Sequence, residues 1–314
     1  MKIAITGACG FIGRNLIAEL EPHGHELLLI DRQRPEDATV FSPGEEGRAA
    51  APLRTDWPYE QGEITDADRM RELLTGMDAV VHLAASPVGY PEKGIETFYH
   101  NAHGTFAVLE ACRLNGVARF VAASSINAFG TFYWRIHPAP VEYASLPLAE
   151  THPAEPQDPY SLSKLVNEHT CAAFHRAYGL TTAALRFGAV WTDDAYRNAL
   201  EFGLPGTDGW SDDLYTWVHV RDIARGIRLA LEAERLPGHG VYTLNAGDTR
   251  CPEPTMALLR RYKPEYAQRL AVPLEGRAAL ISIEAARNAF GYAPVYTLEE
   301  AVRAEDRSIA LDHE

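Results

Sequence analysis

Short apolar runs alternate along the chain with segments whose apolar residues recur three or four positions apart. The runs are bounded by glycine and polar residues and are typical of buried strands, whereas the spaced segments predict amphipathic helices. The predicted strands are KIAIT at 2–6, ELLLID at 26–31, DAVVHLAA at 78–85, ARFVAASS at 118–125 and TAALRFGAV at 182–190. The predicted helices cover 11–24, 66–77, 94–115 and 159–178.

This alternation of strands and helices predicts an α/β fold with a doubly wound parallel Rossmann sheet, because parallel strands need crossover helices. Residues 1–187, with contributions from 215–245, are expected to form that domain, and 188–314 mainly a smaller C-terminal substrate-binding lobe. The polar stretch 32–62 is interpreted as a connection, which is long for an α/β unit. Beyond residue 188 the pattern predicts helices at 221–234, 253–262 and 297–307 and a strand near VYTLNAG at 241–247.

The charge, the apolar runs and the cysteines of the chain limit which partners, compartment and metal sites are expected. The 314-residue chain has a net charge of −14, whereas nucleic acids and anionic membranes attract an excess of Lys and Arg, so neither is expected as a partner. No apolar run reaches the roughly 18 residues that a membrane span needs. The cysteines (Cys9, Cys112, Cys171 and Cys251) form no C-x-x-C pair, which favours a reducing cytoplasm. No H-E-x-x-H or similar spacing is present, and no metal site is expected.

The first candidate site is the glycine-rich stretch TGACGFIG. Gly7, Gly10 and Gly13 are spaced three apart between a predicted strand and a predicted helix. In a dinucleotide site such glycines permit a tight turn, a close approach of backbone to pyrophosphate, and close packing of helix on strand. The free N–H groups of the following helix attract phosphate. The alternative is a tight strand–helix turn without a ligand.

Asp31 ends the next predicted strand, where a carboxylate accepts hydrogen bonds from the adenosine ribose of a dinucleotide. A carboxylate there repels the 2′-phosphate of NADP, so NAD is the expected cofactor. Arg32 and Arg34 leave NADP as a less favoured alternative, because an arginine in this position can bind that phosphate.

The second candidate site is PYSLSK at 159–164. Asp158 is a good N-cap and Pro159 suits the first helical position, so Tyr160 begins a helix and Lys164 lies one turn later on the same face. A fixed ammonium stabilises a phenolate, and Lys164 is expected to bring the pKa of Tyr160 toward neutral pH. Ser125, at the end of a predicted strand, could bind the substrate hydroxyl. The alternative is an exposed helix turn.

Taken together, these motifs resemble the extended short-chain dehydrogenase/reductase superfamily, also called the NAD-dependent epimerase/dehydratase family. The resemblance rests on TGACGFIG, ID at 30–31, HLAA at 82–85, Asn101 with GT at 104–105, SSINAFG at 124–130, YSLSK, LRFGAVW at 185–191, WVHVRDIARG at 217–226 and ARNAFGYAP at 286–294. It implies Tyr160 as base, Lys164 on the nicotinamide ribose and Ser125 as partner of the substrate hydroxyl. It also implies cofactor contacts from Gly7, Gly10, Phe11, Ile12, Gly13, Asp31, Arg32, Ile64, Leu83, Ala84, Ala85, Asn101, Tyr160, Lys164 and Phe187.

Three reactions of such a family are compared. A sugar 4,6-dehydratase has an acidic pair after its Ser or Thr, and Ile126 and Asn127 stand there instead, which disfavours dehydration. A nucleotide-sugar 4-epimerase typically has a longer segment where only 28 residues separate Arg186 from Tyr215. A dehydrogenase of a free sugar or sugar acid is therefore preferred, with the epimerase as its alternative. A non-catalytic NAD(P)-sensing protein is less favoured because Tyr160 and Lys164 are both present.

Similarity to uronate dehydrogenases suggests how the sugar-like substrate is bound. AYRNAL would place Arg197 on a substrate carboxylate, with Ser86, Ser125 and Asn127 as further contacts. The alternative for Arg197 is an ordinary surface charge. The family's helices at 94–115 and 159–178 pair across a dimer, so a homodimer is expected. Spare apolar positions for that contact are Phe106, Leu109, Leu165 and Phe174.

Overall fold

The computed structural model describes residues 1–39, 52–132, 135–270 and 272–302. Its centre is a seven-stranded sheet in the order β3-β2-β1-β4-β5-β6-β9, and every neighbouring pair is parallel. The strands are β1 (Lys2–Thr6), β2 (Glu26–Asp31), β3 (Tyr59–Gln61), β4 (Ala79–His82), β5 (Arg119–Ser125), β6 (Thr181–Phe187) and β9 (His239–Leu244). The strand order reverses between β1 and β4, which confirms the doubly wound Rossmann prediction.

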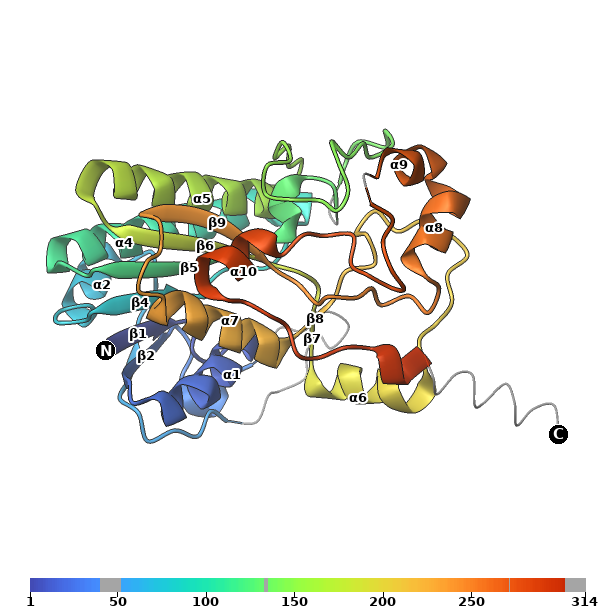
Figure 1. The fold of residues 1–314 in the computed structure, drawn as a ribbon. Coiled ribbons are helices and arrows are strands. Elements are labelled where there is room, and N and C mark those ends of the chain that lie inside the picture. The colour runs from blue at the N-terminus through green and yellow to red at the C-terminus, as the bar shows by residue number, and fades with distance from the viewer. Residues whose placement is uncertain (40–51, 133–134, 271, 303–314) are drawn as a thin grey trace.

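Helices cover both faces of this sheet (Figure 1). Ile3 and Ile5 of β1 belong to a core cluster with residues of α1 (Phe11–Leu20), α7 (Val220–Glu232) and α10 (Glu284–Phe290). Ala4 between them belongs to a second cluster with residues of α2 (Ala67–Leu73), α4 (Gly104–Asn115) and α5 (Pro159–Tyr178). Successive strand residues point to opposite faces, so both sides of β1 are buried.

The C-terminal lobe lies beyond one end of the sheet (Figure 1). Its elements are β7 (Val190–Trp191), which pairs with β8 (Val218–His219), α6 (Asp193–Phe202), α8 (Thr255–Tyr262) and α9 (Pro264–Arg269). Not all of the chain after residue 188 stays in the lobe. Strand β9 pairs with β6, and residues 283–292 pack into the core cluster beside β1.

Several sequence predictions need correction. The stretch 32–62 is not one connection, because β3 forms at 59–61 and pairs with β2; its residues 40–51 lie outside the described chain. Three helices, α6, α9 and α10, were not predicted. The predicted helix at 297–307 is described only to 302, and residues 299–302 are helical. Leu109 and Phe174 are not spare apolar positions, since both are buried in the core, whereas Phe106 is 52% exposed.

The predicted helix at 94–115 is present but is not regular. It consists of α3 (Gly94–Phe98), a π-helical turn at Tyr99–His103, and α4. Such turns are rare and often occur at functional sites. Within the ranges that the structure describes, no helix is both long and apolar enough to cross a membrane.

Candidate active site

The glycine-rich turn between β1 and α1 is shaped by contacts that exclude side chains. Gly7 has φ +76°, and a Cβ there would lie 2.7 Å from the backbone nitrogen of Ala84. A Cβ on Gly13 would lie 2.5 Å from the carbonyl oxygen of Gly7. Helix α1 then begins at Phe11, and no side chain caps it at Gly10. The first N–H groups of α1 are therefore available to an anion, as a pyrophosphate site requires.

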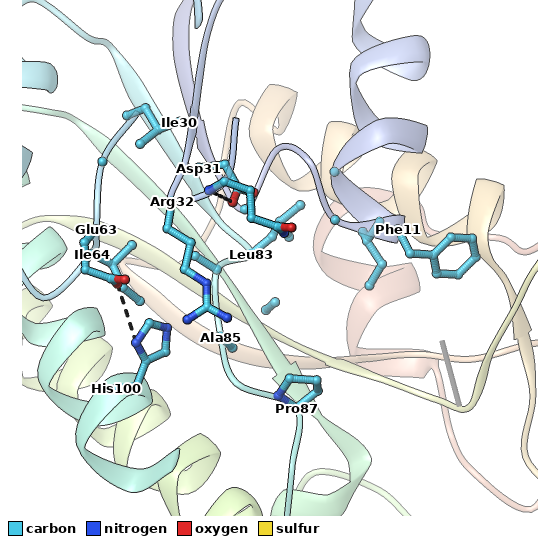
Figure 2. Close-up of a pocket in the computed structure, with 18 of the residues that line it drawn as sticks. Phe11, Ile30, Asp31, Arg32, Glu63, Ile64, Leu83, Ala85, Pro87 and His100 are labelled. Atoms are coloured by element: carbon cyan, nitrogen blue, oxygen red, sulfur yellow. Dashed lines mark hydrogen bonds and ion pairs between the residues drawn. The ribbon is translucent and has the colours of Figure 1, made fainter. Parts of the chain in front are cut away.

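This turn opens into a cavity of about 330 Å³ at the carboxyl ends of the strands. Figure 2 shows the cavity with Phe11, Asp31, Arg32, Ile64 and Leu83 around it. Most predicted cofactor residues line it together: Gly7, Gly10, Phe11, Ile12, Gly13, Asp31, Arg32, Ile64, Leu83, Ala84, Ala85, Tyr160, Lys164 and Phe187. Sequence reasoning missed Ile30, Gln33, Thr39, Gly62, Glu63, Pro87, His100, Ala123 and Ser124, which line the same cavity.

Asp31 is held in place by the backbone at the end of β2. Its Oδ2 accepts a hydrogen bond from the Cys9 backbone N–H, and its Oδ1 accepts one from that of Gln33, both at 3.0 Å. The first of these bonds ties the carboxylate to the glycine-rich turn. Because these two bonds fix the carboxylate and Asp31 lines the cavity, it is in place to accept ribose hydroxyl donors.

Arg32, Glu63 and His100 surround the same end of the cavity. The side chain of Arg32 extends into the cavity (Figure 2), and Nδ1 of His100 lies 3.5 Å from Oε1 of Glu63. Burial, the largest effect, lowers the pKa of His100, while the neighbouring Glu63 acts in the opposite direction. Glu63 follows β3, which was not predicted, and His100 depends on the π turn, so the sequence pattern predicted neither residue.

Tyr160 and Lys164 face the cavity from the first turns of α5. The Asp158 side chain accepts a 2.9 Å hydrogen bond from the Ser161 N–H, which fixes the start of the helix as predicted. The Nζ of Lys164 donates a 2.9 Å hydrogen bond to the carbonyl oxygen of Ala123 and lies 5.6 Å from the centre of the Tyr160 ring. Both side chains line the cavity, so neither belongs to an exposed helix turn.

The expectation that Lys164 brings the pKa of Tyr160 toward neutral pH is wrong for the protein by itself. Burial dominates and raises the pKa of Tyr160 to about 12, against the lowering effect of a hydrogen bond with Ser125. Burial also lowers the pKa of Lys164 to about 8, while the carboxylate of Glu168 acts in the opposite direction. The site thus holds a neutral phenol that Ser125 contacts, beside a lysine that titrates near neutral pH.

Asn101 acts on the cavity through its neighbours. It is buried in the π turn, and its side chain accepts a 2.7 Å bond from the Ser86 N–H and donates a 2.9 Å bond to the Ser86 carbonyl oxygen. It also donates a 3.0 Å bond to Ser163 Oγ on α5. Asn101 and Ser86 therefore fix the loop after β4 against α5, and neither lines the cavity.

The remaining predicted substrate residues separate into two groups. Asn127 lies two positions after Ser125, is 7% exposed, and its backbone N–H donates a 3.1 Å bond to Ser125 Oγ. Arg197 lies on α6, is 71% exposed, and forms an ion pair with Asp194 on the same helix. Thr192 caps α6 by accepting a bond from the Ala195 N–H. In this geometry Arg197 does not reach the cavity, and its predicted substrate contact has no support.

A parallel doubly wound sheet, with a glycine-rich turn, Tyr160 and Lys164 around one cavity and Ser125 bonded to Tyr160, defines a nucleotide-cofactor enzyme of the short-chain dehydrogenase/reductase class. The chain belongs to the NAD dependent epimerase/dehydratase family, whose model matches residues 3–247. This match confirms the family resemblance, the enzyme prediction and NAD as the cofactor of the family.

Individual relatives agree with this assignment. The chain is 27% identical to UDP-glucose 4-epimerase of Corynebacterium glutamicum, over 95% of this chain and 92% of that protein. It is 30% identical to dTDP-glucose 4,6-dehydratase of Streptomyces griseus, over 82% of this chain and 77% of that protein.

Solved structures share the fold. A short-chain dehydrogenase/reductase superfamily protein from Agrobacterium tumefaciens, with bound NAD, superposes with a TM-score of 0.68 at 23% identity, covering 100% of this chain and 99% of that one. UDP-glucose 4-epimerase of Thermotoga maritima, with UDP-glucose, gives a TM-score of 0.67 at 21% identity over 100% of both chains.

Proposed function

We propose that this chain is an NAD-dependent epimerase that inverts a secondary alcohol of a nucleotide-linked sugar, in the manner of a UDP-sugar 4-epimerase. The observation that carries the proposal is that Tyr160 and Lys164 line the cavity that begins at the glycine-rich turn, with Ser125 hydrogen-bonded to Tyr160. The similarity to UDP-glucose 4-epimerases over nearly the whole chain supports the epimerase, which was the alternative to the dehydrogenase.

The residues present fit NAD. A Cβ on Gly7 or Gly13 would fill the cradle where a pyrophosphate would approach the backbone, and the Asp31 carboxylate stands where the adenosine ribose would be bound. Lys164 would bind the nicotinamide ribose. When bound, NAD supplies the acceptor for the hydride of the alcohol carbon and, in an epimerase, the donor that returns it.

The protein's own residues handle the proton. Tyr160 would remove the proton of the substrate hydroxyl as the C–H bond breaks, and would give it back when the alcohol is restored. Ser125 would bind the same oxygen and orient it toward Tyr160. Because burial holds the pKa of Tyr160 at about 12, the phenol needs positive charge beside it, and the Lys164 ammonium is the nearest one that these residues offer.

A dehydrogenase of a free sugar or sugar acid is the second candidate, and one observation favours it. A nucleotide diphosphate needs cationic partners, yet two arginines of the lobe are engaged with carboxylates. Arg250 lies 2.7 Å from Asp213, and the buried Arg277 is paired with Asp248. The segment between Arg186 and Tyr215 is shorter than is typical of nucleotide-sugar epimerases, which also favours the dehydrogenase.

A homodimer is proposed through the outer face of α3, the π turn, α4 and α5. Apolar side chains are exposed on these elements: Ile95, Tyr99, Phe106 and Leu162. Light scattering after gel filtration tests the dimer, with Phe106→Glu expected to yield monomers. The cysteines at 9, 112, 171 and 251 are buried and free, which suits the proposed cytoplasmic location.

The deciding experiment separates the two candidates by the fate of the hydride. Purified protein is incubated with UDP-glucose and a trace of NAD, and the sugar nucleotides are separated by chromatography. Conversion to UDP-galactose without growth of absorbance at 340 nm supports the epimerase. Steady NADH formation from a free sugar or uronate with excess NAD supports the dehydrogenase instead. Activity of either kind that survives in Tyr160→Phe contradicts the proposed mechanism.

A further inference from the structure

Glu168 lies at the centre of a buried polar cluster behind the catalytic residues. It is on α5, one turn beyond Lys164, and is only 4% exposed. Its Oε1 accepts a 2.6 Å hydrogen bond from Ser124 Oγ and a 2.8 Å bond from Nε of Arg186. Its Oε2 accepts a second 2.8 Å bond from the Arg186 guanidinium. One carboxylate therefore joins α5 to the ends of both β5 and β6.

The strand end that Glu168 holds supplies two contacts of the catalytic residues. Ser124 stands between Ala123, whose carbonyl oxygen accepts the hydrogen bond of Lys164, and Ser125, which bonds with Tyr160. A displacement of Ser124 would move both neighbours, because they share one short length of backbone. The bond from Ser124 to Glu168 thus fixes the spacing between β5 and the catalytic turn of α5.

The pair formed by Glu168 and Arg186 is costly to bury. Two well-packed apolar side chains are often as stable as a buried ion pair, so stability alone does not explain its presence. The position of Glu168 one helical turn from Lys164 offers another explanation for the buried pair. Burial would remove the charge of Lys164, and the Glu168 carboxylate opposes that effect by raising the pKa of this lysine.

We infer that Glu168 is a positioning residue, which Ser124 and Arg186 hold in place so that it fixes the end of β5 and keeps the buried ammonium of Lys164 charged. The titratable and charged groups around Lys164 are Tyr160 and Glu168 on α5, His82 on β4, His100 in the π turn and Arg186 on β6. Burial lowers the pKa of both histidines. Among these groups Glu168 is the one carboxylate. The need for a charged Lys164 beside Tyr160 rests on the proposed function.

The inference can be tested without a substrate. The chain has four lysines, at 2, 93, 164 and 263, so protein with ¹³C-labelled lysine gives few signals, and Lys164→Met identifies the one of interest. In the wild type the Lys164 signal should titrate near pH 8. In Glu168→Gln the midpoint should fall by about one pH unit, because an opposing charge is lost. Glu110→Gln is the matched control, since it removes the charge of another glutamate that is paired with an arginine but does not act on Lys164; its midpoint should stay in place.

Glu168→Gln leaves Arg186 buried without its partner and can fail to fold. The double variant Glu168→Met with Arg186→Met removes both charges, and its Lys164 midpoint should also fall, but by less, because the opposing positive charge of Arg186 is lost as well. A midpoint that stays in place in the folded Glu168 variants, or that falls equally in Glu110→Gln, overturns the inference. Because no sugar is present, these results are independent of whether the epimerase assay succeeds.

Discussion

The Nζ of Lys164 lies 2.9 Å from the carbonyl oxygen of Ala123, although 41 residues separate them in the chain. This bond aims the ammonium across the end of β5, so that it lies 5.6 Å from the centre of the Tyr160 ring. The helix alone would put the two side chains on one face. The sheet determines where that face points.

Tyr160→Phe removes the hydroxyl group that is proposed to transfer the proton and leaves the ring that packs beside Lys164. Epimerase or dehydrogenase turnover should fall by roughly 10²–10⁴-fold, which is the usual contribution of general acid–base catalysis. The affinity for NADH, measured by fluorescence titration, should stay nearly the same. Tyr178→Phe, on the exposed last residue of α5, is the matched control and should retain full turnover. Equal losses in both variants would argue against a catalytic Tyr160.

Asp31→Asn tests the choice of NAD. The variant loses the negative charge that would bind ribose hydroxyl groups and repel a 2′-phosphate. The Kd for NAD, measured by calorimetry, should rise roughly 10- to 100-fold, since a hydrogen bond to a charged group contributes about 1.5–3 kcal/mol. The preference for NAD over NADP should narrow. Asp37→Asn, at an exposed position near the same strand, should leave the Kd for NAD and the preference for NAD over NADP unchanged. An unchanged preference in Asp31→Asn would contradict the role of this carboxylate.

Gly13→Ala tests the cradle at the start of α1. The added methyl group would lie 2.5 Å from the Gly7 carbonyl oxygen, so the turn or the helix must shift. We expect weaker NADH binding and a loss of about 1–3 kcal/mol in the free energy of unfolding, which is typical of overpacking. Gly206→Ala is the control, because nothing lies within 4 Å of its added methyl group. Normal NADH binding in Gly13→Ala would show that the turn does not approach the cofactor closely.

The lowered pKa of His82 predicts how the free energy of unfolding depends on pH. Its ring bonds with Thr6 at 2.8 Å and Thr105 at 3.1 Å, and burial, followed by the charge of Lys164, lowers its pKa from 6.5 to about 3. Below pH 6.5 the unfolded chain binds a proton that the folded protein does not. The contribution of neutral His82 to the free energy of unfolding is therefore complete above pH 6.5. It is lost as the pH falls toward 3, by up to about 1.4 kcal/mol per pH unit.

Urea unfolding at pH 7.5, 6.0 and 5.0 measures this dependence. His82→Gln should flatten the decline, although not completely, because burial also lowers the pKa of His219 to about 4. His103→Gln, at an exposed position, should follow the wild type. A wild-type protein that is equally stable at all three pH values would contradict the prediction.

Local sequence determined much of this protein. The apolar runs predicted strands β1, β2, β4, β5 and β6, because a parallel sheet buried on both faces needs continuous apolar segments. The glycine spacing predicted the turn before α1, since only glycine accommodates its geometry. Asp158 and Pro159 predicted where α5 begins, and hence the common face of Tyr160 and Lys164. These features depend on residues a few positions apart, which the sequence displays directly.

The tertiary structure decided what depends on distant neighbours. A periodic pattern identifies one face of a helix but not what covers it, so Leu109 and Phe174 are buried while Phe106 is exposed. Arg197 belonged to a plausible motif, yet the orientation of α6 points it to solvent. His100 reaches the cavity only through the π turn, and Glu168 meets Arg186 only because α5 crosses β6. The sequence predicted that Lys164 lowers the pKa of Tyr160, but burial raises it. The burial of a side chain depends on the packing of the whole protein and cannot be read from the local sequence.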